Sequence, residues 1–149
     1  MNGETPVFVD TNILIYALTA GKDSRHRQAR ARFQTILEQD RLCLSTQVLQ
    51  EVYVTLTKKM RVSAAEAMAV IEDLAEYPLF QVDRGAILEA GRLSSDSRIS
   101  YWDALLVVAA GRMGAEVLLT EDLNHGQMLG HVRIENPFSS TSPALGPPS

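Results

Sequence analysis

Four acidic residues stand where a strand gives way to a helix or where a predicted helix has just begun. Asp10 follows the apolar run 7–9, and Asp122 lies just after a second such run. Glu51 and Asp103 fall in the early turns of two predicted helices. A carboxylate beside a buried strand is costly unless a cation, a positive side chain or helix N–H groups compensate it. Because ligands of open α/β sheets bind outside the carboxyl ends of the strands, these acids predict a cation-dependent site there.

The first three acids also have ordinary structural interpretations. Asp10 has the position of a helix N-cap, where a short polar side chain accepts hydrogen bonds from backbone N–H groups. Glu51 borders an apolar helical stripe, as a surface glutamate does, and Asp103 has capping-box spacing from Ser100. The helical pattern at 104–110 is apolar around most of its circumference, so burial draws its first turn inward. The recurrence of acids in comparable settings favours a shared site.

The fourth position is open between two neighbours. Glu121 and Asp122 both follow the strand predicted at 117–119, and Thr120 can hold either carboxylate through its hydroxyl group. Successive side chains of a strand point to opposite faces, so both acids do not easily enter one site. The spacing alone does not choose between them.

A site of four carboxylates suits Mg²⁺ or Mn²⁺, which take oxygen ligands in octahedral geometry. One such ion activates a water molecule towards phosphorus, and a second ion, about 3.5–4 Å away, stabilises the leaving 3′ oxygen. If the substrate is a phosphodiester, hydrolysis at such a site leaves 5′-phosphate and 3′-hydroxyl ends. Asp10 is predicted as the central ligand, and the other three acids complete the site directly or through waters. The sequence does not distinguish one ion from two.

Together these stretches resemble a PIN domain and, within that class, the VapC-type ribonuclease toxins. The matching segments are FVDTNILIYAL (8–18), LSTQVLQEVYVTLTKK (44–59), ISYWDALLVVAAGRMGAEVLLTEDLNHGQ (99–127) and RIENPF (133–138). The resemblance implies an endoribonuclease whose metal-binding acids are Asp10, Glu51, Asp103 and Asp122, with Thr11, Asn12 and Thr120 in supporting positions. It also implies an RNA substrate, a small VapB-like antitoxin that occupies the active site, and a homodimer. A housekeeping PIN nuclease of RNA processing would have the same pattern and differ in biological role.

Other classes of protein fit these residues less well. Phosphatases that form an aspartyl-phosphate place a second carboxylate two positions after the nucleophile, where this chain has Asn12. A phospho-accepting receiver domain needs paired acids near the first strand and a lysine after a late strand, and the sequence has neither. The glycines are isolated, so no Gly-rich phosphate loop is predicted. The alternative from a different class is a non-catalytic protein-binding module.

Charge and composition limit the interpretation further. The net charge is −4, but without the four candidate acids the remaining 14 acidic residues balance the 14 basic ones. Cations bound at the site would also reduce its repulsion of phosphate. Basic residues cluster in two groups, Lys22, Arg25, His26, Arg27, Arg30 and Arg32, and then Lys58, Lys59 and Arg61. Solvated helix faces are the ordinary interpretation of both groups, and weak binding of RNA backbone or of an acidic partner is the functional one.

The remaining reactive residues have ordinary expected roles. His26, His125 and His131 lack the i, i+4 spacing of helical zinc motifs, and only His125 is close enough to the predicted site to contact substrate. Trp102 is predicted to lie in the core and not to serve as a base-stacking platform. Cys43, the single cysteine, is expected to be a buried thiol in a reducing compartment.

Length and composition predict one compact soluble domain in the cytoplasm. The chain has 149 residues, of which 46% are apolar and 21% charged. No apolar stretch reaches the roughly 18 residues that span a bilayer. Residues 1–6 lack the basic and apolar segments of a secretion signal.

The elements that must position the site alternate between strands and helices. This order predicts an α/β fold, a three-layer α/β/α sandwich with a central parallel sheet. Strands are expected at 6–9, 42–44, 79–82, 117–119 and, at one edge, 132–134. Helices are expected at 11–18, 24–39, 46–60, 63–76, 85–94 and 101–113, with a polar loop at 94–98. The nuclease domain is predicted at 1–138, followed by a disordered tail at 139–149 that is rich in Ser, Pro and Gly.

Overall fold

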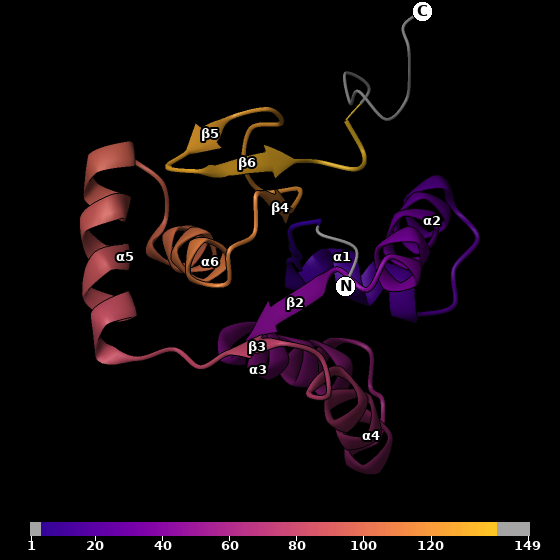
Figure 1. Ribbon diagram of the computed structural model, residues 1–149. Coiled ribbons are helices and arrows are strands. Elements are labelled where there is room, and N and C mark those ends of the chain that lie inside the picture. Colours follow the sequence, from indigo (N-terminus) through magenta and orange to yellow (C-terminus); the bar gives the residue numbers. More distant parts are fainter. Residues whose placement is uncertain (1–3, 140–149) are drawn as a thin grey trace, which may run out of the picture.

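The computed structural model describes residues 4–139, in which one sheet forms the centre of the fold (Figure 1). Its strands lie in the order β3-β2-β1-β4-β6-β5. They are β1 (Val7–Val9), β2 (Leu42–Ser45), β3 (Leu79–Phe80), β4 (Val117–Leu119), β5 (Met128–Leu129) and β6 (Val132–Glu135). All neighbouring pairs are parallel except β5 with β6. The prediction of an α/β fold with a central, mainly parallel sheet is therefore confirmed.

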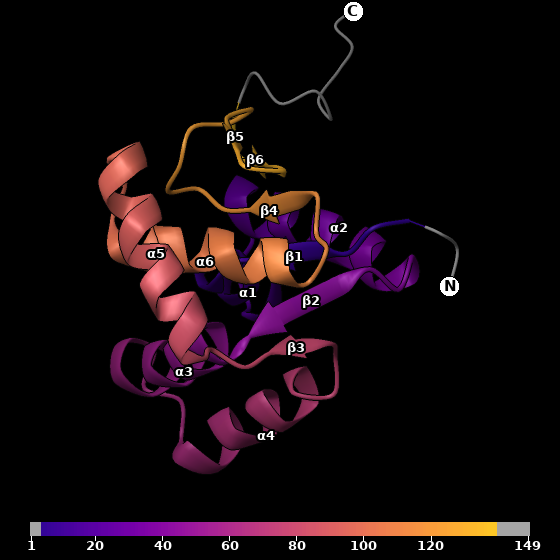
Figure 2. The ribbon, with the colours of Figure 1, turned by 60° about the vertical axis from the view of Figure 1, so that its left-hand side comes forward.

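Helices flank this sheet on both faces. They are α1 (Thr11–Leu18), α2 (Ser24–Glu38), α3 (Thr46–Val54), α4 (Ala64–Leu74), α5 (Arg84–Ser97) and α6 (Tyr101–Arg112). Figure 2 shows α6 in front of β1 and β4, with α1 and α2 behind them, and α3 and α4 beyond β2 and β3. This arrangement gives the three layers that alternating strands and helices predict.

Side-chain caps explain where the helices begin. The N-caps that accept a backbone N–H hydrogen bond are Asp10, Asp23, Ser45, Ser63, Asp83 and Ser100. At Ser63 the hydroxyl group accepts a hydrogen bond from the backbone N–H of Glu66 at 3.1 Å and donates one to the Glu66 carboxylate at 3.0 Å. Each short polar side chain satisfies N–H groups that the first helical turn leaves free.

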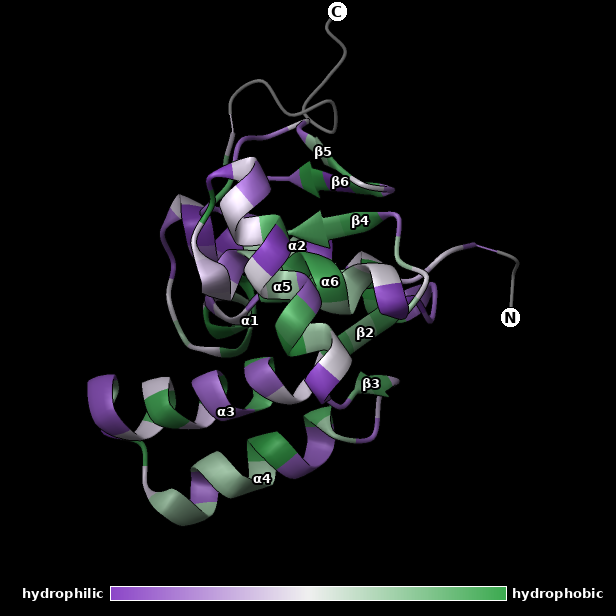
Figure 3. Ribbon diagram, turned by 90° about the vertical axis from the view of Figure 1, so that its left-hand side faces the viewer, coloured by the Kyte–Doolittle hydropathy of each residue, from purple (hydrophilic) through white to green (hydrophobic). Residues whose placement is uncertain are grey.

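The hydrophobic core lies between the sheet and helices α1, α2, α3 and α6. Figure 3 shows β2, β4 and α6 in hydrophobic colours. The residues of β1 are fully buried, and α6 buries seven consecutive residues, 104–110, as its all-round apolar pattern predicts. Cys43 is buried in β2, and burial raises the pKa of its thiol to about 12. It is therefore an unreactive core thiol, as expected.

Three predicted elements differ from the structure. The strand at 132–134 is not an edge strand, because the two-residue strand β5 pairs outside it. The polar loop predicted at 94–98 is instead the last turn of α5, which ends at Arg98 with a left-handed φ of 57°. The helix predicted at 46–60 is α-helical to Val54 and continues as a π-helix, η1 (Thr55–Lys59).

Two expectations concern the chain outside this fold. Apart from Ser139, the tail predicted at 139–149 lies outside the described residues. Among the helices of residues 4–139, none combines the length and apolarity needed to cross a membrane.

Candidate active site

The four predicted acids line one cavity at the carboxyl ends of the central strands. Strand β1 lies between β2 and β4, so the chain order reverses there, and open α/β sheets bind ligands at such points. The cavity has a volume of about 280 Å³ and is lined by Asp10, Glu51, Asp103 and Asp122. Thr11 and Asn12 also line it, whereas Thr120 acts from behind through a hydrogen bond. The fold thus gathers residues from β1, α3, α6 and the segment after β4.

Asp10 is both the N-cap of α1 and the most buried acid of the cavity. Its side chain is 5% exposed. Oδ1 accepts a hydrogen bond from the backbone N–H of Thr11 at 2.6 Å, and Oδ2 accepts one from the hydroxyl group of Thr120 at 2.7 Å. The capping role and the placement in the cavity are therefore compatible in one residue.

Thr120 connects the ends of β4 and β1. Its hydroxyl group donates to Asp10 and accepts a hydrogen bond from the backbone N–H of Asp122 at 3.2 Å. The expectation that Thr120 holds the carboxylate of Glu121 or Asp122 is wrong, because the hydroxyl hydrogen points across the sheet to Asp10. One buried side chain thus fixes the first acid and the backbone of the fourth.

Glu51 is held by two polar side chains. Oε1 accepts a hydrogen bond from the Thr11 hydroxyl group at 2.7 Å, and Oε2 accepts one from the Gln47 amide at 3.2 Å. The same amide nitrogen lies 3.3 Å from the backbone oxygen of Trp102, which joins α3 to α6. Gln47 is a site residue that the sequence interpretation missed. Its signal was the i, i+4 spacing from Glu51, which places both on one helix face.

Asp103 enters the cavity from the first turn of α6. Its backbone N–H donates to the Ser100 hydroxyl group at 3.0 Å, so the spacing between them is that of an N-cap. The Asp103 side chain is half-buried and lines the cavity. Here too the structure combines a capping arrangement with a position in the site.

Glu121 and Asp122 point in different directions. Asp122 lines the cavity, whereas Oε1 of Glu121 forms an ion pair with Arg25 at 2.8 Å. The Arg25 guanidinium group also lies 5.2 Å from the ring centre of Phe138 and 3.3 Å from the hydroxyl oxygen of Tyr16. A basic residue from α2 thus holds Glu121 in a separate cluster.

The pKa values of two acids in the cavity are raised, although hydrogen bonds to their carboxylates lower them in part. Burial raises the pKa of Asp10 to about 7, and the charges of Asp122 and Glu51 add to the rise, while the hydrogen bonds that Asp10 accepts oppose it. Burial is also the main cause of the raised pKa of Asp103, with the same two neighbouring charges contributing. A bound cation would relieve both effects.

The donor atoms fit a hard divalent cation. All four acids offer carboxylate oxygens to the cavity. Within residues 4–139, no three acidic, histidine or cysteine side chains are arranged to hold one ion together. Mg²⁺ usually keeps several waters and needs few direct protein ligands, so this spacing is compatible with it.

The π-helix η1 adds Thr55 to the cavity wall. Single π-helical turns are rare and often occur at functional sites. The wider turn follows Val54 without a break, and the apolar pattern of the segment does not distinguish it from an α-helix. The sequence therefore gave no signal for this residue.

The structure contradicts the expected core position of Trp102 but agrees with an ordinary polar role for His26. Trp102 is 61% exposed, so the prediction that it lies in the core is wrong. His125 accepts the backbone N–H of Asn136 at its Nδ1 atom, 3.0 Å away, and is not part of the cavity wall. His26 bonds to the Asp23 carboxylate, which agrees with an ordinary polar role.

Most of the first basic group stabilises the fold. Arg32 forms a bidentate ion pair with buried Glu135, in which Nε and Nη2 donate to the two carboxylate oxygens at 2.8 and 3.2 Å. Arg30 donates to the backbone oxygens of Thr19 and Gly21. These guanidinium groups connect α2 to its surroundings, so the structural interpretation describes them best.

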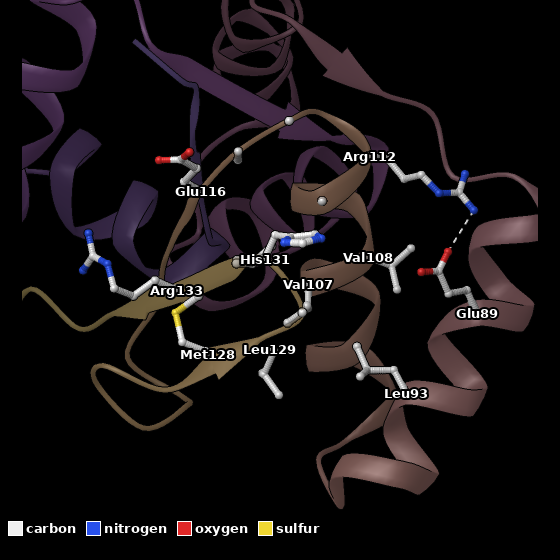
Figure 4. A pocket seen from close by; sticks show the side chains of 15 residues that line it. Glu89, Leu93, Val107, Val108, Arg112, Glu116, Met128, Leu129, His131 and Arg133 are labelled. Atoms are coloured by element: carbon white, nitrogen blue, oxygen red, sulfur yellow. Dashed lines mark hydrogen bonds and ion pairs between the residues drawn. The ribbon is translucent and has the colours of Figure 1, made fainter.

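A larger cavity lies elsewhere and contains none of the four acids. Figure 4 shows it between α5, α6 and the β5–β6 hairpin, with a volume of about 830 Å³. Leu93, Val108 and Leu129 contribute to its wall, and an ion pair of 3.0 Å joins Arg112 to Glu89 at its rim. Glu116 and His131 also line it, but it contains none of the four acids that the fold gathers at the strand ends, so the smaller cavity is the candidate active site.

Comparison with solved structures identifies chains of the same fold. A toxin–antitoxin complex from Klebsiella pneumoniae is 18% identical, over 90% of this chain and 98% of that chain, with a TM-score of 0.65. DNA-bound VapBC from Salmonella typhimurium is 22% identical, over 90% and 99%, with a TM-score of 0.64. VapC20 from Mycobacterium tuberculosis, described as a sarcin–ricin loop cleaving toxin, is 24% identical, over 75% and 86%, with a TM-score of 0.61.

Comparison at the level of sequence gives the family. No curated protein sequence matches the chain significantly. The sequence profile of the PIN domain family matches residues 7–128, from the start of β1 to the first residue of β5. This range includes all four acids and every element that positions them. The chain therefore belongs to the PIN domain family.

Proposed function

We propose that this protein is a metal-dependent endoribonuclease that hydrolyses RNA phosphodiester bonds and acts as a VapC-type toxin. The observation that carries the proposal is buried Asp10, hydrogen-bonded through both oxygens, inside a cavity lined by three further carboxylates. Membership of the PIN domain family supports a nuclease. The likeness to VapBC structures and to a toxin that cleaves the sarcin–ricin loop supports the toxin role and the RNA substrate.

The chain's own residues would hold and orient the reacting groups. Asp10 is the proposed central ligand of Mg²⁺ or Mn²⁺, with Glu51, Asp103 and Asp122 completing the site directly or through waters. Bound divalent ions supply positive charge that activates a water molecule and stabilises the leaving oxygen. Since Thr11 donates to both Asp10 and Glu51, these two carboxylates are fixed relative to each other before substrate binds.

Two lysine side chains near the acids are candidates for contact with the RNA backbone. Lys58 and Lys59 end η1, the segment that also places Thr55 in the cavity wall, and both side chains are exposed. The ion pairs of the described residues include neither of them. Free ammonium groups attract phosphates, so these lysines are proposed to guide the strand past the acids.

The proposed partners are a small VapB-like antitoxin that occupies the cavity and a second copy of the chain. The support for the antitoxin is the similar fold of subunits from toxin–antitoxin complexes. A short reading frame for a DNA-binding protein directly upstream, whose product copurifies with the chain, would identify it. Light scattering of the purified chain tests the homodimer.

The central experiment is RNA cleavage by the purified protein. We expect cleavage with Mg²⁺ or Mn²⁺, its loss in excess EDTA, and its return when the ion is restored. Asp10→Asn protein, purified in the same way, controls for contaminating ribonucleases. Calorimetric titration of Mn²⁺ provides a second readout that does not require activity. Undiminished cleavage in EDTA by wild-type protein would contradict the metal dependence.

A further inference from the structure

A second cavity adjoins the acid cavity and shares part of its wall. Its volume is about 450 Å³, and Gln47, Glu51 and Trp102 line both cavities. Apolar Val82, Ile87 and Leu105 also line it, together with Gln50 and Tyr101. We refer to it as the adjoining cavity. A volume of this size is typical of small-molecule sites, which span about 300–1,000 Å³.

Trp102 is the exposed aromatic residue between the two cavities. Its side chain is 61% exposed although it precedes Asp103 in the first turn of α6. Its backbone oxygen accepts the Gln47 amide, and its ring lies at 80° to that of Tyr101, with centres 5.1 Å apart. The ring thus contacts Tyr101 and leaves much of its surface open, which suits stacking of a planar group.

Gln47 offers an unused acceptor at the same place. Its amide nitrogen donates to Glu51 and to the backbone oxygen of Trp102, and both partners are acceptors, so the orientation of the amide is determined. Oε1 is buried, in a residue that is 6% exposed, and has no hydrogen-bond partner among the described residues. A buried carbonyl oxygen without a partner is unfavourable, so a ligand that brings an N–H donor to it would be stabilised.

We propose that the adjoining cavity binds one unpaired nucleobase of the RNA substrate. The base stacks on Trp102, and an N–H group on its edge donates to Oε1 of Gln47. Because Glu51 lines both cavities, this base belongs to a nucleotide next to the cleaved phosphodiester. The inference rests on the proposed ribonuclease function, and it assigns Trp102 and Gln47 as substrate-binding residues.

A nucleobase fits these walls better than an apolar side chain of a protein partner. Val82, Ile87 and Leu105 would accept either group by burial of apolar surface. An aliphatic or benzyl side chain would leave Oε1 of Gln47 without a donor, whereas the Watson–Crick edge of every base carries an N–H group. The chemistry of the polar wall therefore favours the RNA.

The kinetic test uses Trp102→Ala, Trp102→Phe and a matched control. We expect Trp102→Ala to raise KM for single-stranded RNA about tenfold, the size of the loss of one stacked base, with kcat within about twofold of wild type. Trp102→Phe restores most of the affinity because it keeps an aromatic face. Met128→Ala removes a side chain of similar exposure, 57%, from the larger cavity between α5, α6 and the β5–β6 hairpin. This control variant should leave KM unchanged.

The same substrate with single abasic positions locates the base. In wild-type protein, we expect one abasic position beside the cleaved bond to raise KM about tenfold. In Trp102→Ala protein, that position should have a much smaller effect, because the stacking is already lost and only the contacts with Gln47 and the apolar wall remain. Independent, additive losses would show that the base binds elsewhere and would overturn the proposal.

Fluorescence gives a readout that does not depend on cleavage. Trp102 is the only tryptophan of the chain, so its emission reports directly on this cavity. Without divalent ions, titrated RNA should quench the emission, and RNA with the critical abasic position should not.

If wild-type protein cleaves RNA but Trp102→Ala has an unchanged KM, the cavity serves a protein partner or no ligand, and the proposal is wrong while the ribonuclease assignment stands. If wild-type protein cleaves no RNA, the proposed function fails, and absence of quenching then rejects the base site as well.

Discussion

Asp10 shows how one residue can serve both structure and chemistry. It caps α1 through Oδ1 and is buried in the cavity that Glu51 and Asp122 also line. Its carboxylate form is therefore disfavoured in the metal-free protein, although two hydrogen bonds support it. A bound cation would reverse this preference, which makes Asp10 the residue whose charge state depends most on metal.

The first prediction concerns the pH dependence of folding without metal. The folded-state pKa of Asp10, about 7, lies above its ordinary value of 3.8, so the folded protein holds this proton more tightly than the unfolded chain. The resulting stabilisation is present below about pH 4 and is lost as the pH rises towards 7. Relative to Asp10→Asn, the wild-type free energy of unfolding should fall by about 4 kcal/mol at most over this range. Urea unfolding in EDTA measures the difference, and a pH-independent value would contradict it.

A second prediction separates Asp122 from Glu121. Asp122→Asn should weaken Mn²⁺ binding and RNA cleavage strongly, because it removes a charge from the cavity wall. Glu121→Gln is the matched control, since its carboxylate pairs with Arg25 and an exposed ion pair contributes only about 0–1 kcal/mol. We expect it to leave both properties within a fewfold of wild type. Titration of Mn²⁺ into both variants, beside a cleavage assay, decides the matter, and the reverse ranking would move the fourth ligand to Glu121.

A third prediction distinguishes acids that act in catalysis from acids that stabilise the fold. Glu51→Gln and Asp103→Asn keep side-chain shape but remove charge, so cleavage should fall by orders of magnitude. Without metal, their thermal stability should equal or exceed that of wild type, because like charges no longer repel each other. Unfolding of either variant under conditions where the wild-type protein stays folded would show that these acids are structural.

At the scale of elements, the junctions after β1 and β4 form one unit. The Thr120 hydroxyl group joins them through Asp10 and through the backbone of Asp122. Helix α3 is connected to the same unit, because Glu51 of α3 accepts a hydrogen bond from the hydroxyl group of Thr11. The site is therefore positioned by the ends of packed elements and not by a long loop, which favours a fixed geometry.

The fourth prediction tests this connection with Thr120→Val. Valine has nearly the same shape but leaves one oxygen of Asp10 and the N–H group of Asp122 without their partner. We expect a loss of about 1–3 kcal/mol in the free energy of unfolding, together with weaker Mn²⁺ binding. Thr120→Ser keeps the hydroxyl group and should retain most of both properties. If valine and serine behave alike, the hydrogen bonds of this side chain do not position the site.

At the scale of the whole molecule, the proposed function requires a chain of net negative charge to bind RNA, which is also negatively charged. Much of the basic group on α2 is committed to hydrogen bonds and ion pairs within the fold. Lys58 and Lys59 at the end of η1 are the candidates for contact with phosphate. The net charge of −4 is thus compatible with RNA binding if attraction is local to the cavity mouth.

The fifth prediction concerns the salt dependence of RNA cleavage. Replacing Lys58 and Lys59 by alanine should raise KM at low salt and reduce the slope of log KM against log salt. Each lost contact with a single strand lowers that slope by about 0.7. Lys22→Ala, in the other basic group, is the control and should leave the slope unchanged. An unchanged slope in the double variant would place the phosphate contacts elsewhere.

Local signals in the sequence account for much of the fold and for the four acids. Strand runs such as 7–9 and 117–119, the start of a helix at Ser63 and the all-round apolar helix at 104–110 all appear as predicted. These features depend on residues close together in the chain, where period and capping act directly. The positions of the acids follow, because parallel strands bring their carboxyl ends to one edge of the sheet.

Long-range contacts decided what the sequence left open or predicted wrongly. Glu121 turns away from the cavity because Arg25, 96 positions earlier, pairs with it, and Thr120 bonds to Asp10 across 110 positions. Strand β5 has only two residues, too few for an alternating pattern, and exists because β6 pairs with it. The exposure of Trp102 likewise depends on which neighbours the fold places around it. Such contacts join residues that no local pattern relates, so only the packed chain determines them.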